Sequence, residues 1–294
     1  MSRTTKLLGT VSVLATLAAS PAAAQVTGFA GFVDAQYSHT SIDLDEDYFG
    51  NTDDDGWDSI TIGAGIAFPV DEIEALAWQI DGNYSSQSGD GSSRIVWNLG
   101  GSLFLAYPGS RTGININYET MTDYGSATNG GLFTEWYLGN FTVAGKGGFM
   151  WGGGTPNGGR GNYLGGNVAG YFVPNFAVGG SVTWSDILSG STGVGGGGAA
   201  PCYGPTCGRR DFDETNFTID AEFLVSETFP LSIFGGYTFT DYQRSENSSN
   251  PNLPEQDFNT NTFFIGVRYY LGGMGSLIQM HRTGNLRPWL RGAN

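Results

Sequence analysis

The chain has 294 residues, of which 48 are glycine and only 14% are charged, and its formal net charge is −15. Typical proteins contain about 7% glycine and about 25% charged residues. So acidic a chain is a poor partner for nucleic acid, because binding there depends on lysine and arginine neutralising phosphates. Aromatic residues make up 14% of the chain, which argues against a disordered glycine-rich polymer. The composition favours an ordered all-β sandwich or barrel with glycine-rich turns.

The first residues predict export from the cytoplasm. Arg3 and Lys6 form a positive segment, residues 7–17 are mostly apolar, and Ala22-Ala23-Ala24 offers a cleavage site before Gln25. This pattern indicates a cleaved signal peptide over residues 1–24, with a retained N-terminal anchor as the alternative. After Gln25 no run of eighteen apolar residues occurs, which excludes a helical membrane protein. Removing the signal leaves 11 basic and 28 acidic residues, a net charge of −17.

Alternation of apolar and polar residues recurs along the rest of the chain and predicts strands. In residues 216–223, the side chains of Phe217, Ile219 and Phe223 fall on one face, whereas Asp220 and Glu222 fall on the other. Residues 76–84, 112–118, 176–184 and 231–239 behave in the same way. We count twelve such segments, beginning near Val26, Ser59, Leu76, Arg94, Thr112, Gly131, Phe141, Asn162, Phe176, Asn216, Leu231 and Asn261.

The connections between these segments alternate in length. Short connections cover residues 69–75, 108–111, 139–140, 174–175 and 226–230, and longer polar ones cover 41–58, 122–130, 152–161, 188–214 and 241–260, with a modest one at 86–93. Bacterial outer-membrane barrels have an even number of antiparallel strands, short periplasmic turns and long extracellular loops. A sheet in lipid must close, because an open edge would leave backbone groups unpaired. The pattern predicts a closed up-and-down transmembrane β-barrel over residues 25–272 of about twelve strands, give or take two; a soluble sandwich or a secreted β-solenoid is the alternative.

The last predicted strand carries a recognisable pattern. In residues 264–271, Gly266 is followed by the aromatic Tyr269 and then by the hydrophobic Leu271. This resembles the C-terminal assembly signal of Gram-negative outer-membrane β-barrels, a porin-like superfamily of pores, enzymes and adhesins. The resemblance implies recognition by the barrel-assembly machinery and contact with outer-membrane lipid and lipopolysaccharide. The chain continues for 23 residues past Leu271, and we interpret residues 273–294 as a basic periplasmic tail.

Residues with catalytic chemistry are scarce. The chain has two histidines, His39 at the end of the first predicted strand and His281 in the tail. A hydrolase would need a nucleophile, a base and an orienting group within reach of one another, and Ser38 and Ser41 beside His39 are ordinary loop composition. We therefore expect no catalytic residues, no enzyme activity and no cofactor.

Two motifs fall in predicted loops. Cys202 and Cys207 are the only cysteines, and in an oxidising compartment we expect them to form a disulfide. Asn51, Asp53 and Asp55 match the opening of a calcium loop, but its twelfth position is Ile62 rather than a carboxylate, so the match is weak. We predict no metal site and expect this acidic run to be a solvated surface.

If the apolar face meets lipid, the polar face lines the interior. The sequence therefore predicts an outer-membrane, porin-like channel for passive diffusion of small hydrophilic solutes, with extracellular loops and both termini periplasmic. Because an acidic lining favours cations, we expect this channel to prefer cations. The alternative is a non-conducting structural or adhesin-like barrel. The expected charged lining has six acids and two bases: Asp34, Asp81, Glu119, Glu135, Lys146, Asp220, Glu222 and Arg268.

Overall fold

The computed structural model describes most of the predicted barrel. Its described residues are 28–44, 56–70, 73, 75–89, 92–121, 125–152, 159–189, 210–226, 228–244, 258–272 and 275–283. Within these ranges no helix is long and apolar enough to cross a membrane. The predicted signal peptide, the pair Cys202 and Cys207, and the calcium-loop residues Asn51, Asp53 and Asp55 lie outside the described residues.

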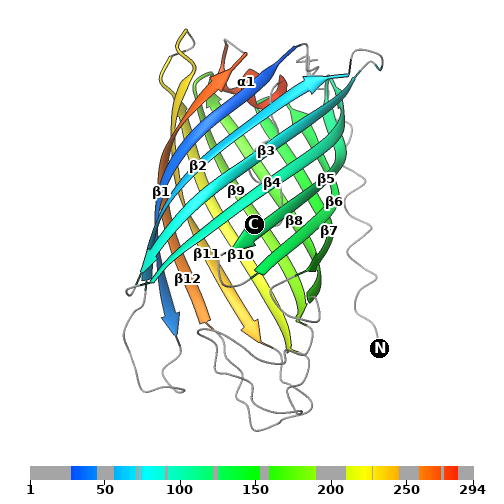
Figure 1. Ribbon diagram of the computed structural model, residues 1–294. Coiled ribbons are helices and arrows are strands. Elements are labelled where there is room, and N and C mark those ends of the chain that lie inside the picture. Colours follow the sequence, from blue (N-terminus) through cyan, green and yellow to red (C-terminus); the bar gives the residue numbers. More distant parts are fainter. Residues whose placement is uncertain are drawn as a thin grey trace, which may run out of the picture.

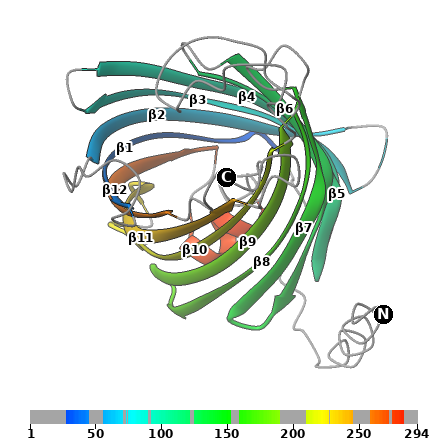
Figure 2. The same cartoon turned by 90° about the horizontal axis from the view of Figure 1, so that it is seen from below.

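Twelve antiparallel strands form one closed barrel, in which each strand pairs with its neighbours in sequence and β1 pairs with β12 (Figures 1 and 2). The seam between β1 and β12 runs from the pair Gly31–Leu271 to the pair Leu44–Phe258, so neither strand has an open edge. This confirms the predicted fold class and strand number. The strands are β1 (Ala30–Leu44), β2 (Gly56–Pro69), β3 (Leu76–Gly89), β4 (Ser92–Tyr107), β5 (Ser110–Met121), β6 (Gly125–Leu138), β7 (Phe141–Gly152), β8 (Gly159–Val173), β9 (Phe176–Ser189), β10 (Arg210–Leu224), β11 (Leu231–Arg244) and β12 (Phe258–Leu271).

The outer wall of the barrel is apolar. In β10, the side chains of Phe217, Ile219 and Phe223 are 50%, 65% and 48% exposed, whereas inward-facing Glu222 and Leu224 are buried. Each of the remaining strands contributes exposed apolar side chains in the same alternation, for example Ile60, Ile114, Leu132, Phe149, Leu164 and Ile265. An apolar band this extensive would be unfavourable against water, and it is the surface that a barrel of the outer-membrane type presents to lipid.

One end of the barrel is built from short turns. The pairs β4–β5, β6–β7 and β8–β9 are each joined by two residues, 108–109, 139–140 and 174–175. In the β6–β7 turn, Gly139 has a φ of +58°, a conformation that glycine adopts without steric cost. We call this the short-turn end, and the opposite end the long-loop end.

A short helix, α1 (Leu277–Thr283), follows β12 and lies at the short-turn end. Figure 1 places it beside the start of β1, and Figure 2 places it within the outline of the barrel. The backbone N–H of Leu277 donates to the carbonyl of Pro174 in the β8–β9 turn at 2.8 Å. Leu277 and Met280 are buried against inward-facing apolar side chains of the barrel, including Phe32 and Leu224. This part of the predicted tail is therefore packed against the barrel.

Candidate channel lumen

A cavity of about 530 Å³ occupies the barrel interior. Its lining comes from ten of the strands, β1–β5 and β8–β12, and from His281 of α1. Of the eight predicted lumen residues, six line the cavity: Asp34, Asp81, Glu119, Asp220, Glu222 and Arg268. The other two, Glu135 on β6 and Lys146 on β7, also face inward but are buried outside this lining, at 0% and 3% exposure. Lys146 Nζ lies 6.0 Å from the centre of the Tyr163 ring.

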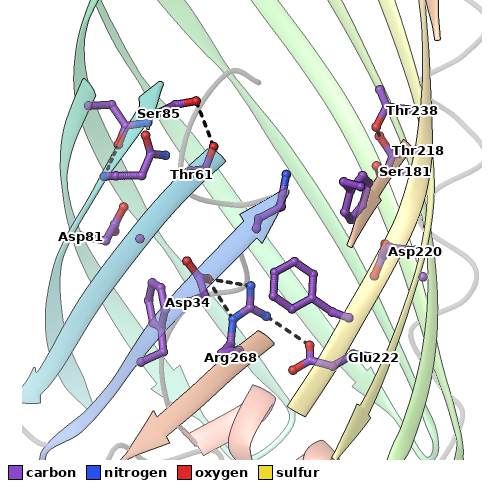
Figure 3. A pocket seen from close by; sticks show the side chains of 18 of the residues that line it. Asp34, Thr61, Asp81, Ser85, Ser181, Thr218, Asp220, Glu222, Thr238 and Arg268 are labelled. Carbon is purple, nitrogen blue, oxygen red and sulfur yellow. Dashed lines mark hydrogen bonds and ion pairs between the residues drawn. The ribbon is translucent and has the colours of Figure 1, made fainter. Parts of the chain in front are cut away.

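Arg268 of β12 joins two carboxylates on different strands, at the side of the cavity nearer the short-turn end (Figure 3). Its Nε and Nη2 donate to Asp34 Oδ2 of β1 at 3.1 and 2.9 Å, and its Nη1 donates to Glu222 Oε2 of β10 at 3.1 Å. The guanidinium carbon lies 4.6 Å from the centre of the Phe234 ring and 5.7 Å from that of Phe32. Buried charges are retained when they are paired and hydrogen-bonded, and Arg268 meets both conditions.

Glu222 contacts four polar side chains in the cavity. Its Oε1 accepts hydrogen bonds from Ser232 Oγ at 2.5 Å and from Tyr270 OH at 2.6 Å. Its Oε2, which accepts a hydrogen bond from Arg268, also lies 3.2 Å from His281 Nε2. Glu222 therefore connects the barrel wall to α1, and the alternation pattern alone gave no sign of that role.

A second ion pair lies on the opposite side of α1 and was not predicted. Arg111 of β5 and Glu135 of β6 are both 0% exposed, and Arg111 Nη2 lies 2.7 Å from Glu135 Oε2. Tyr137 OH also donates to Glu135 Oε2, at 3.2 Å. We expected a turn to extend through residue 111, whereas β5 begins at Ser110. Extending the alternation of Asn117 and Asn115 back along the chain would have placed Arg111 inward.

The aspartates of the cavity lie close to glycines of neighbouring strands. A Cβ atom added to Gly179 of β9 would lie 2.6 Å from Asp220 Oδ1, and one added to Gly100 of β4 would lie 3.1 Å from Asp81 Oδ1. A larger residue at either position would therefore require the carboxylate to shift. The small residues allow the carboxylates to lie along the wall, as Figure 3 shows for Asp81 and Asp220, and this leaves space in the lumen.

Hydroxyl and amide groups line the cavity toward the long-loop end. Thr61 donates to Ser85 Oγ at 3.0 Å, and the hydroxyls of Thr218 and Thr238 lie 2.9 Å apart (Figure 3). Glu214 of β10 belongs to this inward face and binds Asn216 at 2.5 Å. We expected residue 214 to end a loop, but β10 begins at Arg210. The result is a polar wall along this part of the cavity.

Neither a metal site nor an assembly role follows from these contacts. Among the described residues, no group of three or more His, Cys, Asp or Glu side chains is placed to hold a metal ion. The predicted assembly-signal residues lie at the end of β12: Gly266 is buried, Tyr269 faces outward, 5.7 Å from the ring of Phe229, and Leu271 pairs with Gly31. Their recognition by the assembly machinery remains a prediction.

Comparisons with known proteins find similarity of fold but none of sequence family. No protein-family model matches the chain, and no curated protein sequence matches it. Among solved structures, the chain is similar to the KdgM porin in complex with disordered oligogalacturonate, with 9% identity, a TM-score of 0.44 and coverage of 80% of this chain and 98% of that one. A Pseudomonas aeruginosa FadL homologue shows 11% identity and a TM-score of 0.46, covering 85% and 92% of the two chains. OmpT, an outer membrane protein of Vibrio cholerae, shows 10% identity and a TM-score of 0.40, covering 82% and 97%.

Proposed function

We propose that this protein is a porin-like channel of the Gram-negative outer membrane, for passive diffusion of small hydrophilic solutes. The observation that carries the proposal is a cavity of about 530 Å³, lined mostly by polar and charged residues, inside a barrel whose outer wall is apolar. Lipid and lipopolysaccharide would contact that outer wall, and the signal peptide and assembly signal would deliver the chain to the membrane. In this arrangement the long loops are extracellular and the short-turn end, with both termini, is periplasmic.

Cation preference is part of the proposal. The cavity is lined by five carboxylates, those of Asp34, Asp81, Glu119, Asp220 and Glu222, against one arginine and one histidine. Arg268 is engaged with Asp34 and Glu222, so its charge is largely balanced within the wall. The remaining carboxylates give the lumen a negative potential, and rings of Asp and Glu are the device by which channels select cations.

The test is a single-channel recording. The refolded full chain is inserted into a planar bilayer, and the reversal potential is measured in a salt gradient for the parent and for a double variant, Asp81→Asn with Asp220→Asn. We expect discrete conductance steps and a cation-to-anion permeability ratio that falls by roughly twofold or more in the double variant, since two charges leave a narrow lumen. Asp58→Asn is the matched control, because Asp58 is exposed on the outer wall and hydrogen-bonds to Tyr37 and His39. An unchanged reversal potential in the double variant would contradict the selectivity proposal.

A second candidate is a non-conducting structural or adhesin-like barrel. The observation that favours it is the filling of the short-turn end by α1 and by the Arg111–Glu135 and Arg268 networks. A folded and inserted protein that stays electrically silent under every condition would support this candidate over the channel. Neither candidate assigns a chemical reaction or a cofactor to the barrel.

A further inference from the structure

The chain reverses direction after β12 so that α1 enters the short-turn end. Gly272, just after the end of β12, has a φ of +79°, and Gly275, just before the helix, has a φ of +151°, conformations that other residues rarely adopt. Ser276 and Gln279 then start the helix as a capping box: Ser276 N–H donates to Gln279 Oε1 at 3.1 Å, and Gln279 N–H donates to Ser276 Oγ at 3.4 Å. This arrangement satisfies backbone donors of the first helical turn. The local sequence therefore favours a helix at this position.

The helix is fixed to one wall of the barrel through its last turn. The ring of His281 lies between two tyrosines, with Nδ1 3.0 Å from Tyr171 OH on β8 and Nε2 2.9 Å from Tyr270 OH on β12. The same Nε2 lies 3.2 Å from Glu222 of β10. Three strands therefore hold one side chain of the helix.

The opposite wall holds the helix through two arginines. Arg111 Nη2 of β5 donates to the backbone carbonyl of His281 at 2.5 Å. Arg282 of α1 donates from Nη2 to the carbonyls of Gly139 and Phe141, both at 2.8 Å, at the β6–β7 turn. Its guanidinium carbon also lies 4.9 Å from the centre of the Tyr137 ring. These contacts reach strands β5 to β7, so α1 bridges the mouth from one wall to the other.

The helix adds little apolar contact to this polar attachment. It has seven residues, and only Leu277 and Met280 are buried apolar side chains, with Ile278 partly buried. Isolated helices of this length are not stable in water, so the helix depends on the wall for its position. An element held by a few hydrogen bonds and two apolar side chains belongs to the least stable part of a protein, from which moving elements are drawn.

We infer that α1 is an intramolecular plug of the short-turn mouth, and that Arg111 and Arg282 latch it in the closed position. The inference rests on the proposed channel function. In the docked state the helix obstructs passage from the cavity to the short-turn side. Release of the latch frees the helix from the β5–β7 wall and opens the lumen. The barrel wall stays intact, because its twelve strands pair with one another without α1.

The first experiment compares single-channel records of the full chain, the variant Arg282→Ala, and a chain lacking residues 275–294. Heat modifiability on a gel verifies that each barrel is folded. We expect the open probability to rise at least about tenfold in both variants, since each removes charge-assisted hydrogen bonds from the docked state. Arg244→Ala is the matched control, because it also removes an arginine but stands at the end of β11 that is farthest from α1. Full-chain conductance equal to that of both variants overturns the plug and leaves the channel standing.

A second measurement keeps the inference testable if no variant conducts, an outcome that would refute the channel itself. In a background with Cys202→Ser and Cys207→Ser, Met280→Cys is reacted with a hydrophilic maleimide in detergent. Met280 is 7% exposed, so we expect slow labelling in the latched chain and labelling at least about tenfold faster after Arg282→Ala. Equally fast labelling in both chains would show that α1 is not held in the mouth and would overturn the inference.

Discussion

The replacement Arg268→Met tests whether the ion-pair network stabilises the short-turn end of the barrel. Arg268 makes three hydrogen bonds to Asp34 and Glu222, whose side chains are 13% and 7% exposed. Methionine keeps the apolar contact with Phe234 but leaves both carboxylates without their cation. Hydrogen bonds to charged groups contribute about 1.5–3 kcal/mol each, so the three together set an upper limit of roughly 5–9 kcal/mol.

The expected loss is smaller than this limit. Glu222 keeps its bonds from Ser232 and Tyr270, and Asp34 lines the cavity, where water can reach it. Breaking a buried pair by removing one partner typically costs about 3–5 kcal/mol, because the remaining charge stays buried. We expect Arg268→Met to lower the free energy of unfolding by that amount.

The assay is equilibrium unfolding in guanidinium with tryptophan fluorescence, on protein folded in detergent micelles. A compensated variant, with Asp34→Asn and Glu222→Gln added to Arg268→Met, separates the charge effect from lost packing. Because neutral groups replace the whole network, we expect this variant to recover most of the loss. A cost below about 1 kcal/mol for Arg268→Met alone, or no recovery in the compensated variant, would refute the reasoning.

Three further substitutions test the two faces of the wall, with the free energy of unfolding measured in the same way. Gly63→Ala places a methyl group against Asp34 Oδ1 and should cost about 1–3 kcal/mol, whereas the control Gly109→Ala meets no atom within 4 Å and should be nearly neutral. Ile219→Arg puts a charge on an outward position that is 65% exposed. For this variant the protein is folded into lipid vesicles in place of micelles, where the change should cost about 2–4 kcal/mol, and a neutral result would argue against lipid contact there. Phe104→Ala removes a ring that is 1% exposed and packs in a buried apolar cluster with Phe133 and Ala144, so it should cost about 3–5 kcal/mol; a loss below about 1 kcal/mol would mean that this cluster contributes little.

The strands and their faces were readable from the sequence. Successive side chains of a strand point to opposite faces, so the alternation in residues 216–223 identified both the apolar wall and the inward position of Glu222. The number of alternating segments gave the strand number, and the alternating connection lengths indicated a barrel of the outer-membrane type. Strand ends were less accurate, because the turn residues at 108–111 and the glycine-rich connection at 188–214 hide where pairing starts. Arg111 and Glu214 were therefore placed in loops although both belong to strands.

Contacts between side chains across the lumen could not be predicted from the sequence and were seen only in the tertiary structure. Which inward residues meet depends on strand tilt and on the stagger between strands, and these are properties of the closed barrel. Arg268 was predicted to face inward, but its simultaneous contact with Asp34 and Glu222 required β1 and β10 to be placed around β12.

The position of α1 also separates what the sequence determines from what the tertiary structure decides. The sequence by itself determined a closed barrel with an apolar outside and an acidic inside, because both follow from a repeat of two residues along each strand. It did not determine that the chain turns back after Leu271, since residues 275–283 carry no periodic signal that names a partner. Only the folded barrel brings His281 and Arg282 to acceptors and donors on strands more than a hundred residues earlier, at Arg111, Tyr171 and the β6–β7 turn. The physical reason is that a strand's faces are fixed by local geometry, whereas the filling of the lumen is fixed by contacts that exist only once the barrel has closed.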